Sequence, residues 1–484
     1  MRQNNGENKI GIFEGIAYCI GDIIGSGIFV SPTSILRHTG SVGLSLCVWA
    51  LGGLIAACGA LVYVELGTSI RNSGGDFAYL SHAKWHPLAS AFLWVSTTLT
   101  FPIIMAIQTL TFGEYLVDGL NSFFPINSEF IGILKRLIGF LIIWIICFMN
   151  LFSLNKIAGR FQVVLTIIKL IVITTIIIIG LYQLLFNFNN ENNINFLNIF
   201  NGSKTEPGEF VLALYASLLA YNGWDILNFA TDEIENPRKV LPLAALCGIG
   251  ISTIVYILIN ISYFSVLNIE EFLNTEAVAV KFAQKTMGDF SRIFPFLIAI
   301  ILLGNLNSSI FASSRYVFAG AKNGIMPSVF SSVNEKSMSP RVAIIYEMIV
   351  LISLSFIGDL EHLIGYMSYS LWMQKSCTMV ALLYMRHNGK FKLNKDSIKT
   401  PIILPFICLV IFISMLIISA KKDPFIIIYA LIMLFIGLIL YYIFINPQRR
   451  GKSLIFGKYF EKLNDLSLFF AQIVFNTTVQ VKEE

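Results

Sequence analysis

The sequence predicts an all-α membrane protein with twelve transmembrane helices, of which helices 1 and 6 are broken. Three observations support this fold class. The 484 residues are 56% hydrophobic and only 13% charged, whereas about 25% of the residues in a typical soluble domain are charged. Twelve apolar segments have a length close to or above the roughly 20 residues that are needed to span a bilayer. Two of these segments are interrupted near the middle by glycine and polar residues.

The apolar segments follow one another closely, so we expect a single membrane domain and no separate soluble domain. Residues 1–8 and 447–484 are predicted to be cytosolic terminal segments. The predicted spans, in chain order, are 9–36, 42–69, 88–118, 131–152, 158–186, 209–232, 240–267, 292–320, 341–358, 361–385, 402–420 and 424–446.

Lys and Arg predict which loops face the cytosol, because membrane proteins keep these residues in cytoplasmic loops. With the N-terminus inside, the basic residues concentrate in one set of segments, so both termini are predicted to be cytosolic. This set is 1–8, 70–87, 153–160, 233–239, 321–341, 386–401 and 447–484. The loop 187–208 is then extracellular, and its Asn201 heads a predicted glycosylation sequon. The seven cysteines all lie in apolar segments, where we expect free thiols.

Segments 1 and 6 are both interrupted by glycine and polar residues. Segment 1 contains "GDIIGSGIFV" at 21–30, and segment 6 contains "YNGWD" at 221–225. Broken helices at corresponding positions of two halves are typical of transporters with inverted repeats and a site near the membrane midplane. The predicted repeats cover about 9–186 and 209–385, and two extra helices follow at about 402–446. A small-residue packing motif or a simple kink is the alternative explanation.

The breaks offer backbone groups that a continuous helix would consume. The half-helix that begins at Ser26 and Gly27 directs N–H groups and a positive dipole end at the break, which suits a carboxylate. Carbonyl groups that end the preceding half-helices suit an ammonium group, and glycine allows a ligand to approach the backbone closely. A carboxylate receptor opposite an ammonium receptor describes an α-amino acid. The predicted substrate site comprises Ile23, Gly25, Ser26, Gly27, Leu219, Ala220, Asn222 and Asp225.

Several stretches, in order, resemble one family. They are "IIGSGIFVSP" (23–32), "YVELGTSIRNSGGDFAYL" (63–80), "GWDILNFATDEIENPRKVLPLA" (223–244) and "SSRYVFAGAKNGIMP" (313–327). Together they resemble the L-type amino acid transporters, the light subunits of heteromeric transporters in the amino acid–polyamine–organocation superfamily. The resemblance covers nearly the whole chain. It implies a five-plus-five inverted repeat, alternating access and obligatory exchange, with Ile23, Ser26 and Gly27 holding the polar groups of the substrate.

The chain departs from the family pattern at several positions. Leu219 stands where much of the family has an aromatic gate, and Asn222 replaces a residue that is usually small. Asp225 stands where the cationic-plus-neutral branch carries Asp and neutral-substrate members mostly carry Asn. The resemblance therefore predicts a plasma-membrane exchanger of cationic and large neutral L-amino acids, with broad neutral exchange as the alternative. The loop 117–130 lacks the Cys that typically links light subunits to a single-span glycoprotein, so we expect at most a non-covalent partner.

Ionisable residues inside the spans are functional candidates. Lys169 matches a family lysine near the sodium site of sodium-coupled relatives, and a structural lysine paired with carbonyls or an acid is the equal alternative. Asp22 is unusual for the family and could pair with Lys169 or tune the charge of the site. Glu65 and Arg315 are predicted structural or gating charges. Helix–helix or interfacial partners are predicted at Glu14, Glu114, Glu347 and Lys375, and intracellular gate charges at Asp76, Asp232, Glu233, Arg238 and Lys239.

Other classes of protein fit the sequence less well. A channel would need a pore-lining repeat or a ring of charge, receptors commonly have seven spans, and no nucleophile–base set indicates an enzyme. The five His show no ligand spacing and no CxxC pair occurs, so we expect no metal site. The net charge of +5 requires no nucleic acid partner, because cytoplasmic loops account for it. No cofactor is expected, and a sodium ion as co-substrate remains open.

Overall fold

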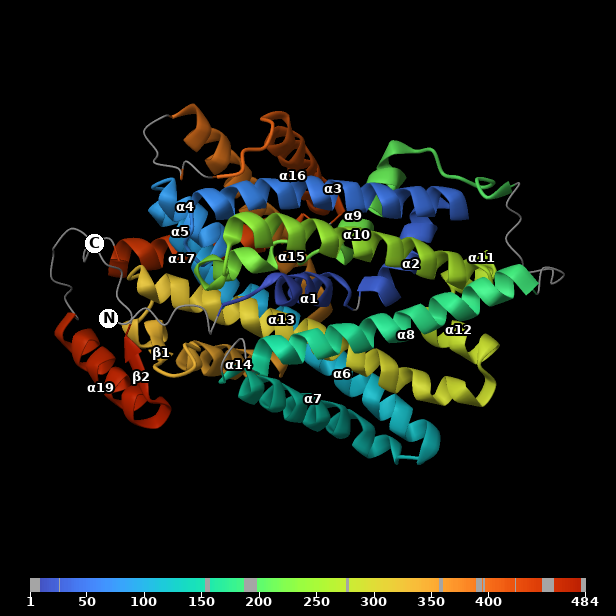
Figure 1. Cartoon of the computed structure of the whole chain (residues 1–484), viewed down its shortest axis with the longest axis horizontal. Coiled ribbons are helices and arrows are strands. Elements are labelled where there is room, and N and C mark those ends of the chain that lie inside the picture. Colours follow the sequence, from blue (N-terminus) through green and yellow to red (C-terminus); the bar gives the residue numbers. More distant parts are fainter. Residues whose placement is uncertain are drawn as a thin grey trace.

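The computed structural model is a bundle of helices that run roughly along one common direction (Figure 1). Four elements mark what we call the tail end: α4 (Gly75–His82), β1 (Ser332–Asn334), α19 (Gly457–Phe475) and β2 (Thr477–Val479). The opposite end carries α11 (Ile269–Leu273) and α12 (Val278–Thr286). The structure describes residues 9–25, 27–152, 157–186, 198–275, 278–356, 360–388, 394, 397–422, 424–445 and 457–479.

The remaining elements follow the chain in two sets. The first set is α1 (Ile12–Ile23), α2 (Gly27–Thr39), α3 (Val42–Ser69), α5 (His86–Val95), η1 (Ser96–Thr100), α6 (Phe101–Phe123), α7 (Ser128–Asn150) and α8 (Gly159–Phe186). The second set is α9 (Pro207–Ala220), η4 (Ile226–Glu233), α10 (Pro237–Phe264), η5 (Gly288–Ile293), α13 (Phe294–Lys322), η6 (Ser328–Ser331), α14 (Arg341–Ser355), α15 (Leu360–His387), α16 (Ile403–Lys422), α17 (Phe425–Leu440) and η7 (Tyr441–Ile445).

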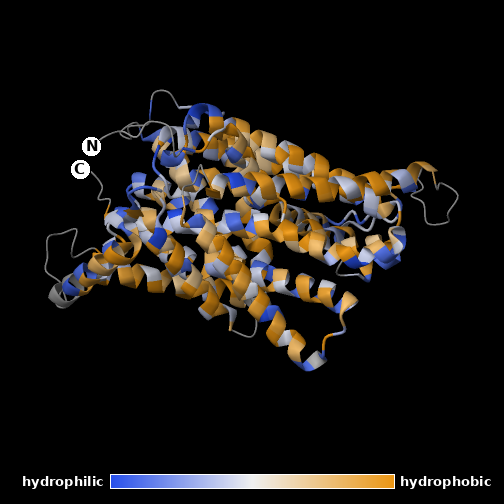
Figure 2. Ribbon diagram, turned by 60° about the horizontal axis from the view of Figure 1, so that its bottom comes forward, coloured by the Kyte–Doolittle hydropathy of each residue, from blue (hydrophilic) through white to orange (hydrophobic). Residues whose placement is uncertain are grey.

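Hydrophobic residues cover the flanks of the bundle (Figure 2). Among the described residues, eight helical stretches are long and apolar enough to cross a membrane. Their outward faces carry large apolar side chains, such as Leu141 and Trp144 on α7 and Phe435 on α17, which are more than half exposed. In water this surface would be unfavourable, whereas in a bilayer it contacts lipid. The chain is therefore a multi-span all-α membrane protein, as its sequence predicts.

The predicted spans correspond to helices in the structure, and both predicted interruptions are present. Segment 1 is divided into α1 and α2, and segment 6 into α9 and η4. Prolines at the starts of α9 and α10 fit helix N-termini, because proline lacks the N–H that an N-terminus leaves unpaired. The part of segment 6 after the break is a 3₁₀-helix, η4. The predicted C-terminal tail contains α19 and β2, which the sequence analysis did not foresee.

Candidate functional site

The two breaks lie directly against each other. α1 ends at Ile23 and α9 ends at Ala220, and the carbonyl oxygens of both residues lie 2.8 Å from the hydroxyl of Tyr256 on α10. One side chain thus bridges the carbonyl ends of the two half-helices. Tyr221, the first residue of the second break, donates a hydrogen bond to the Trp49 carbonyl at 3.1 Å and packs edge-on against Tyr256. The carbonyl groups predicted to receive an ammonium group therefore lie around one hydroxyl.

Lys169 reaches the first break from α8. Its Nζ donates to the carbonyl of Gly21 at 2.9 Å and also to the carbonyl of Ile24, and its side chain is fully buried. These carbonyls end α1, where no later turn supplies N–H donors. The lysine ammonium thus satisfies backbone acceptors that the break leaves free. This is the arrangement of a lysine paired with carbonyls, which is one of the two alternatives predicted for Lys169.

The second half of helix 1 begins beside the same point. α2 starts at Gly27, and a Cβ on this glycine would lie 2.9 Å from the Cα of Ala220. The close approach that requires glycine here is therefore an approach to α9. Ser26, a predicted substrate ligand, lies outside the described residues. Gly25 is buried at the bend, whereas Leu219 is 38% exposed and leaves the gate position without an aromatic ring.

Asp22 faces the second break. Gly223 adopts φ +112°, which favours glycine, and a Cβ there would lie 2.6 Å from Oδ2 of Asp22. Within the described part of the chain, the Asp22 carboxylate has no hydrogen bond or ion pair, and Lys169 binds the neighbouring carbonyls instead. Pairing with Lys169, one of the two possibilities considered for Asp22, is absent among these residues. Asp22 is thus an acidic group beside the carbonyl ends that Tyr256 bridges.

Asp225 does not face an open pocket. It lies in the turn before η4, and its Oδ2 forms a buried ion pair with Nζ of Lys375 on α15. The Lys375 ammonium also lies 4.4 Å from the ring centroid of Trp224 and 5.1 Å from that of Tyr63. A lysine of the chain itself therefore supplies the positive charge beside Asp225, a residue of the predicted substrate site. Lys375 is a helix–helix partner, as the sequence analysis predicted.

A buried polar network extends this ion pair toward α4. Asp76 accepts hydrogen bonds from the hydroxyl of Tyr63, from Oγ1 of Thr378 at 2.8 Å and from Nε2 of Gln374 at 3.3 Å. Gln374 in turn bonds the hydroxyl of Tyr316 at 2.7 Å. Asp76 is only 4% exposed. Hydrogen-bond donors from α3 and α15 thus enclose the carboxylate of Asp76, the residue predicted to be an intracellular gate charge.

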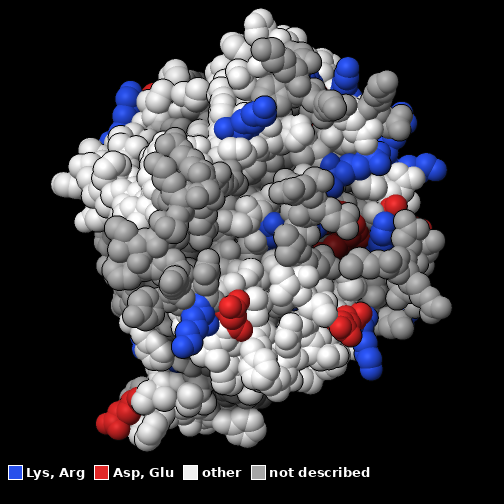
Figure 3. Space-filling view, turned by 90° about the vertical axis from the view of Figure 1, so that its left-hand side faces the viewer, with Lys and Arg blue, Asp and Glu red and all other residues white. Residues whose placement is uncertain are grey.

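Charged contacts join several elements at the tail end of the bundle, where basic and acidic side chains are interspersed (Figure 3). Arg315 of α13 forms a bidentate pair with Glu233, with both N···O distances at 3.1 Å. Lys322 lies 3.7 Å from Asp232, and the N–H of Ile10 donates to the Glu233 carbonyl at 2.8 Å. These contacts join α13, η4 and the start of the chain below the breaks. Arg315, predicted to be a structural or gating charge, and Glu233, predicted to be a gate charge, are therefore paired with each other at this end.

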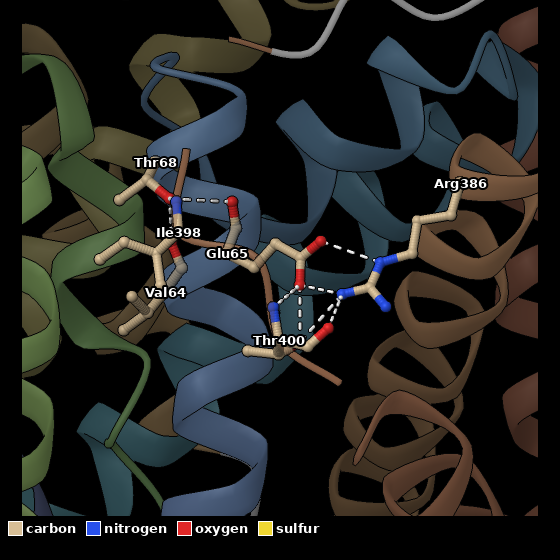
Figure 4. Close-up of polar contacts among 6 residues, drawn as sticks. All are labelled: Val64, Glu65, Thr68, Arg386, Ile398 and Thr400. Carbon is tan, nitrogen blue, oxygen red and sulfur yellow. Dashed lines mark hydrogen bonds and ion pairs between the residues drawn. The ribbon is translucent and has the colours of Figure 1, made fainter. Parts of the chain in front are cut away.

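Glu65 anchors the segment that follows α15 to the tail end of α3. Arg386 donates to both of its carboxylate oxygens, and the backbone N–H and the hydroxyl of Thr400 donate to Oε2 at 2.9 and 2.6 Å (Figure 4). One turn along α3, Oγ1 of Thr68 accepts from the N–H of Ile398 at 3.1 Å. The Glu65 side chain is 2% exposed. Because its oxygens are well bonded, Glu65 has a structural role here.

Polar contacts also join elements at the opposite end. Nδ1 of His38 at the end of α2 lies 3.0 Å from Oε2 of Glu209 at the start of α9. Lys204 donates to the Arg37 carbonyl at 2.8 Å and so ties the loop before α9 to α2. Asn201, the predicted glycosylation site, is exposed in this same loop. Contacts therefore join the two broken helices both above and below the breaks.

Sequence reasoning missed several residues of this site. Tyr256 bridges the breaks, and Tyr63, Gln374 and Thr378 enclose Asp76. A weak signal was present, because each places a polar atom inside a predicted apolar span. That signal does not tell which distant group the polar atom meets, since the partners of Tyr256 are backbone carbonyls.

Comparison with known proteins identifies the chain. The family model described as amino acid permease matches residues 10–450. The chain belongs to the amino acid permease family. Over 476 residues the permease is 40% identical to Amino acid transporter protein 6 of Caenorhabditis elegans, an alignment that covers 98% of this chain and 90% of that protein.

Two further relatives are transporters as well. The permease is 34% identical over 446 residues to the human cystine/glutamate transporter, covering 92% of this chain and 87% of the relative. It is equally identical over 446 residues to the b(0,+)-type amino acid transporter 1 of Rattus norvegicus, covering 92% and 89%. The permease is therefore an amino acid transporter and not an enzyme.

Replacing Lys169 tests the importance of its contacts to the break. In Lys169→Met, the carbonyls of Gly21 and Ile24 lose their donor, which costs about 1–3 kcal/mol for each buried acceptor left unsatisfied. We expect transport per surface molecule to fall at least tenfold, with a smaller loss of surface expression. Uptake normalised to surface biotinylation measures both quantities.

Lys135→Met is the matched control, because Lys135 pairs with Glu114 at an exposed site on α7. Exposed pairs contribute about 0–1 kcal/mol, so this variant should keep its transport. Unchanged turnover in Lys169→Met would show that the ammonium at the break is not required.

Proposed function

We propose that the permease is an alternating-access exchanger of L-amino acids in the plasma membrane and that neutral amino acids are its main substrates. The observation that carries this proposal is the junction of the two breaks at Tyr256. It brings two carbonyl-ended half-helices together beside the N-terminus of α2. Carbonyl oxygens accept from an ammonium group, and a helix N-terminus favours a carboxylate. An α-amino acid presents both groups on adjacent atoms.

The ion pair between Asp225 and Lys375 supports a neutral side chain in the substrate. Both side chains are less than 8% exposed, so separating them without a replacement partner would be costly. A substrate lysine or arginine would have to displace Lys375 from Asp225 and from the faces of Trp224 and Tyr63. A neutral side chain leaves these contacts intact. Neutral substrates are therefore favoured over the cationic ones that Asp225 alone would suggest.

Asp22 supports a second candidate, exchange of cationic as well as large neutral amino acids. Its carboxylate contacts Gly223 in the second break and has no hydrogen bond or ion pair to the described residues. A substrate cation would supply a partner for this charge, as a buried or partly buried carboxylate requires. The two candidates place the selectivity for charge at different acids, so they are separable by mutation.

The same proposal covers the gating contacts, the sodium dependence and the orientation of the permease in the membrane. The contacts of Arg315 and Glu233 at the tail end, and of His38 and Glu209 at the opposite end, would open in turn during the cycle. Because Lys169 already places an ammonium at the end of α1, we propose transport without sodium. The tail end would face the cytosol, in line with the basic residues of its loops. A single-span partner would bind without a disulfide, since loop 117–130 has no Cys.

Trans-stimulation tests the exchange itself. The purified permease is reconstituted into proteoliposomes, and one sample is preloaded with about 1 mM unlabelled leucine, the upper end of typical KM values. The preloaded vesicles should take up labelled leucine several-fold faster than empty ones. Arginine inside should stimulate less than leucine, and replacing external sodium by choline should change nothing. Equal uptake into loaded and empty vesicles would contradict exchange.

Lys375→Met tests the assignment of charge selectivity. This variant leaves Asp225 without its partner, so a substrate ammonium or guanidinium becomes the available cation. We expect lysine and arginine uptake to rise at least tenfold relative to leucine uptake, because charge-assisted hydrogen bonds contribute roughly 1.5–3 kcal/mol. Competition against labelled leucine in proteoliposomes measures the ratio.

The double variant Lys375→Met/Asp225→Asn is the matched control, since it removes both charges and should return to neutral preference. If the unmodified permease already exchanges lysine as well as leucine, the second candidate is favoured. Asp22→Asn should then abolish lysine uptake and spare leucine uptake.

A further inference from the structure

The C-terminal helix α19 is fixed to the tail end of the bundle along one side. The side chain of Asn464 bonds Ser328 of η6 twice, accepting from its N–H at 3.2 Å and donating to its hydroxyl at 2.6 Å. Ala471, almost two turns further along the helix, is buried. These contacts set the rotation of α19 about its own axis.

The chain after α19 is fixed by a strand pairing and by several side-chain hydrogen bonds. β2 pairs antiparallel with β1, with Thr477 opposite Asn334. Asn334 donates to the carbonyls of Phe475 and Asn476 at 3.0 and 2.9 Å. Arg341, at the start of α14, donates to the Phe475 carbonyl at 3.0 Å and to the Leu151 carbonyl beyond α7 at 3.0 Å. The position of α19 is therefore linked to the ends of both α7 and α14.

The other side of α19 is apolar and exposed. Residues of an α-helix follow one another at about 100°, so the six large apolar residues with 54% to 65% exposure fall on one continuous face. Polar exposed residues such as Asp465 and Gln472 flank it. The six residues are Leu463, Leu466, Phe469, Phe470, Ile473 and Val474.

This face continues a surface that already contacts lipid. α19 lies at the perimeter of the tail end, beside α14 and β2 and not over the centre of the bundle (Figure 1). Phe148, in the last turns of α7, is 59% exposed on the lipid-facing surface and packs against Phe152. Leu151 between them is the residue that Arg341 connects to the end of α19. The end of α7, which carries exposed apolar side chains, and the end of α19 are thus connected through Arg341.

We propose that the apolar face of α19 is embedded in the interface of the membrane leaflet at the tail end, among the headgroups and upper acyl chains. Helices with one apolar face and flanking polar residues lie in this layer with the apolar side buried about 5–10 Å. The bilayer is the occupant that the fold already requires. Through Arg341 and Asn334, the embedded helix holds the α13–α14 connection and the end of α7 at a fixed depth in the membrane.

Fluorescence quenching in single-copy nanodiscs tests this proposal. The seven native cysteines are replaced by serine or alanine, and bimane is attached at Phe470→Cys or, as the matched control, at Gln472→Cys. These positions lie about 160° apart around the helix. A lipid carrying a nitroxide near its headgroup should quench bimane at 470 at least three-fold more than at 472. Iodide in solution should give the reverse order.

Each alternative has its own outcome. Equal iodide quenching at both positions would overturn the proposal, because the face would then be in water. Shielding from iodide without lipid quenching would also overturn it and would indicate a protein contact, which single-copy discs confine to this chain. Photoreactive phospholipid cross-linking of the unmodified permease avoids the substitutions: peptides from 463–475 should be labelled as strongly as peptides from α7. Labelling of α7 alone would contradict the proposal.

Discussion

The structure of the permease depends on how it satisfies backbone carbonyl groups at two broken helices inside a membrane. Lipid offers no hydrogen-bond donors, and each polar backbone group left unpaired there costs several kcal/mol. Two side chains place donor groups at these carbonyls. Lys169 donates to the carbonyls of Gly21 and Ile24, and Tyr256 lies within 2.8 Å of the carbonyls of Ile23 and Ala220. α8 and α10 are thereby tied to the breaks, and the remaining helices pack around this junction.

The same constraint explains how a functional site can exist in this position. Carbonyl groups that are held by replaceable donors remain available to a ligand that brings better ones, and an ammonium group is such a ligand. The charges nearby are largely balanced within the chain: Asp225 pairs with Lys375, and Asp76 lies among hydroxyl and amide donors. Asp22 is the acid at the break that the described residues leave without a partner. Selectivity for charge then depends on which acid can exchange its partner for a substrate.

The sequence was sufficient to predict the spans and the breaks, because both follow from local composition. Apolar segments of sufficient length form membrane helices, and glycine next to a polar residue marks a point where a helix is interrupted. The partners of the charged residues could not be predicted in the same way. Asp225 and Lys375 are separated by 150 positions, and nothing in either segment specifies that they meet. The family resemblance placed Asp225 in the substrate site, whereas in the folded chain Asp225 pairs with Lys375.

The structure of the C-terminal segment could not be predicted from the sequence for a similar reason. Residues 457–479 are less apolar than the spans, so they read as a polar terminal segment, yet contacts from Asn334 and Arg341 order them as α19 and β2. The type of helix after Asp225 could not be predicted either, because a 3₁₀-helix and an α-helix share most of their sequence preferences over eight residues. Tertiary contacts determine the structure of such segments, and these contacts cannot be predicted from the local sequence.

The central claim is that the junction of the breaks recognises the two charged groups of an α-amino acid. The most direct measurement compares inhibition of labelled leucine uptake by leucine, by 4-methylpentanoate, which lacks the amino group, and by 3-methylbutylamine, which lacks the carboxylate. All three share the leucine side chain, so differences report the receptors alone. The account predicts that each truncated compound inhibits at least tenfold more weakly than leucine, since each loses charge-assisted hydrogen bonds of roughly 1.5–3 kcal/mol. Inhibition by either compound at the same concentration as leucine would contradict it.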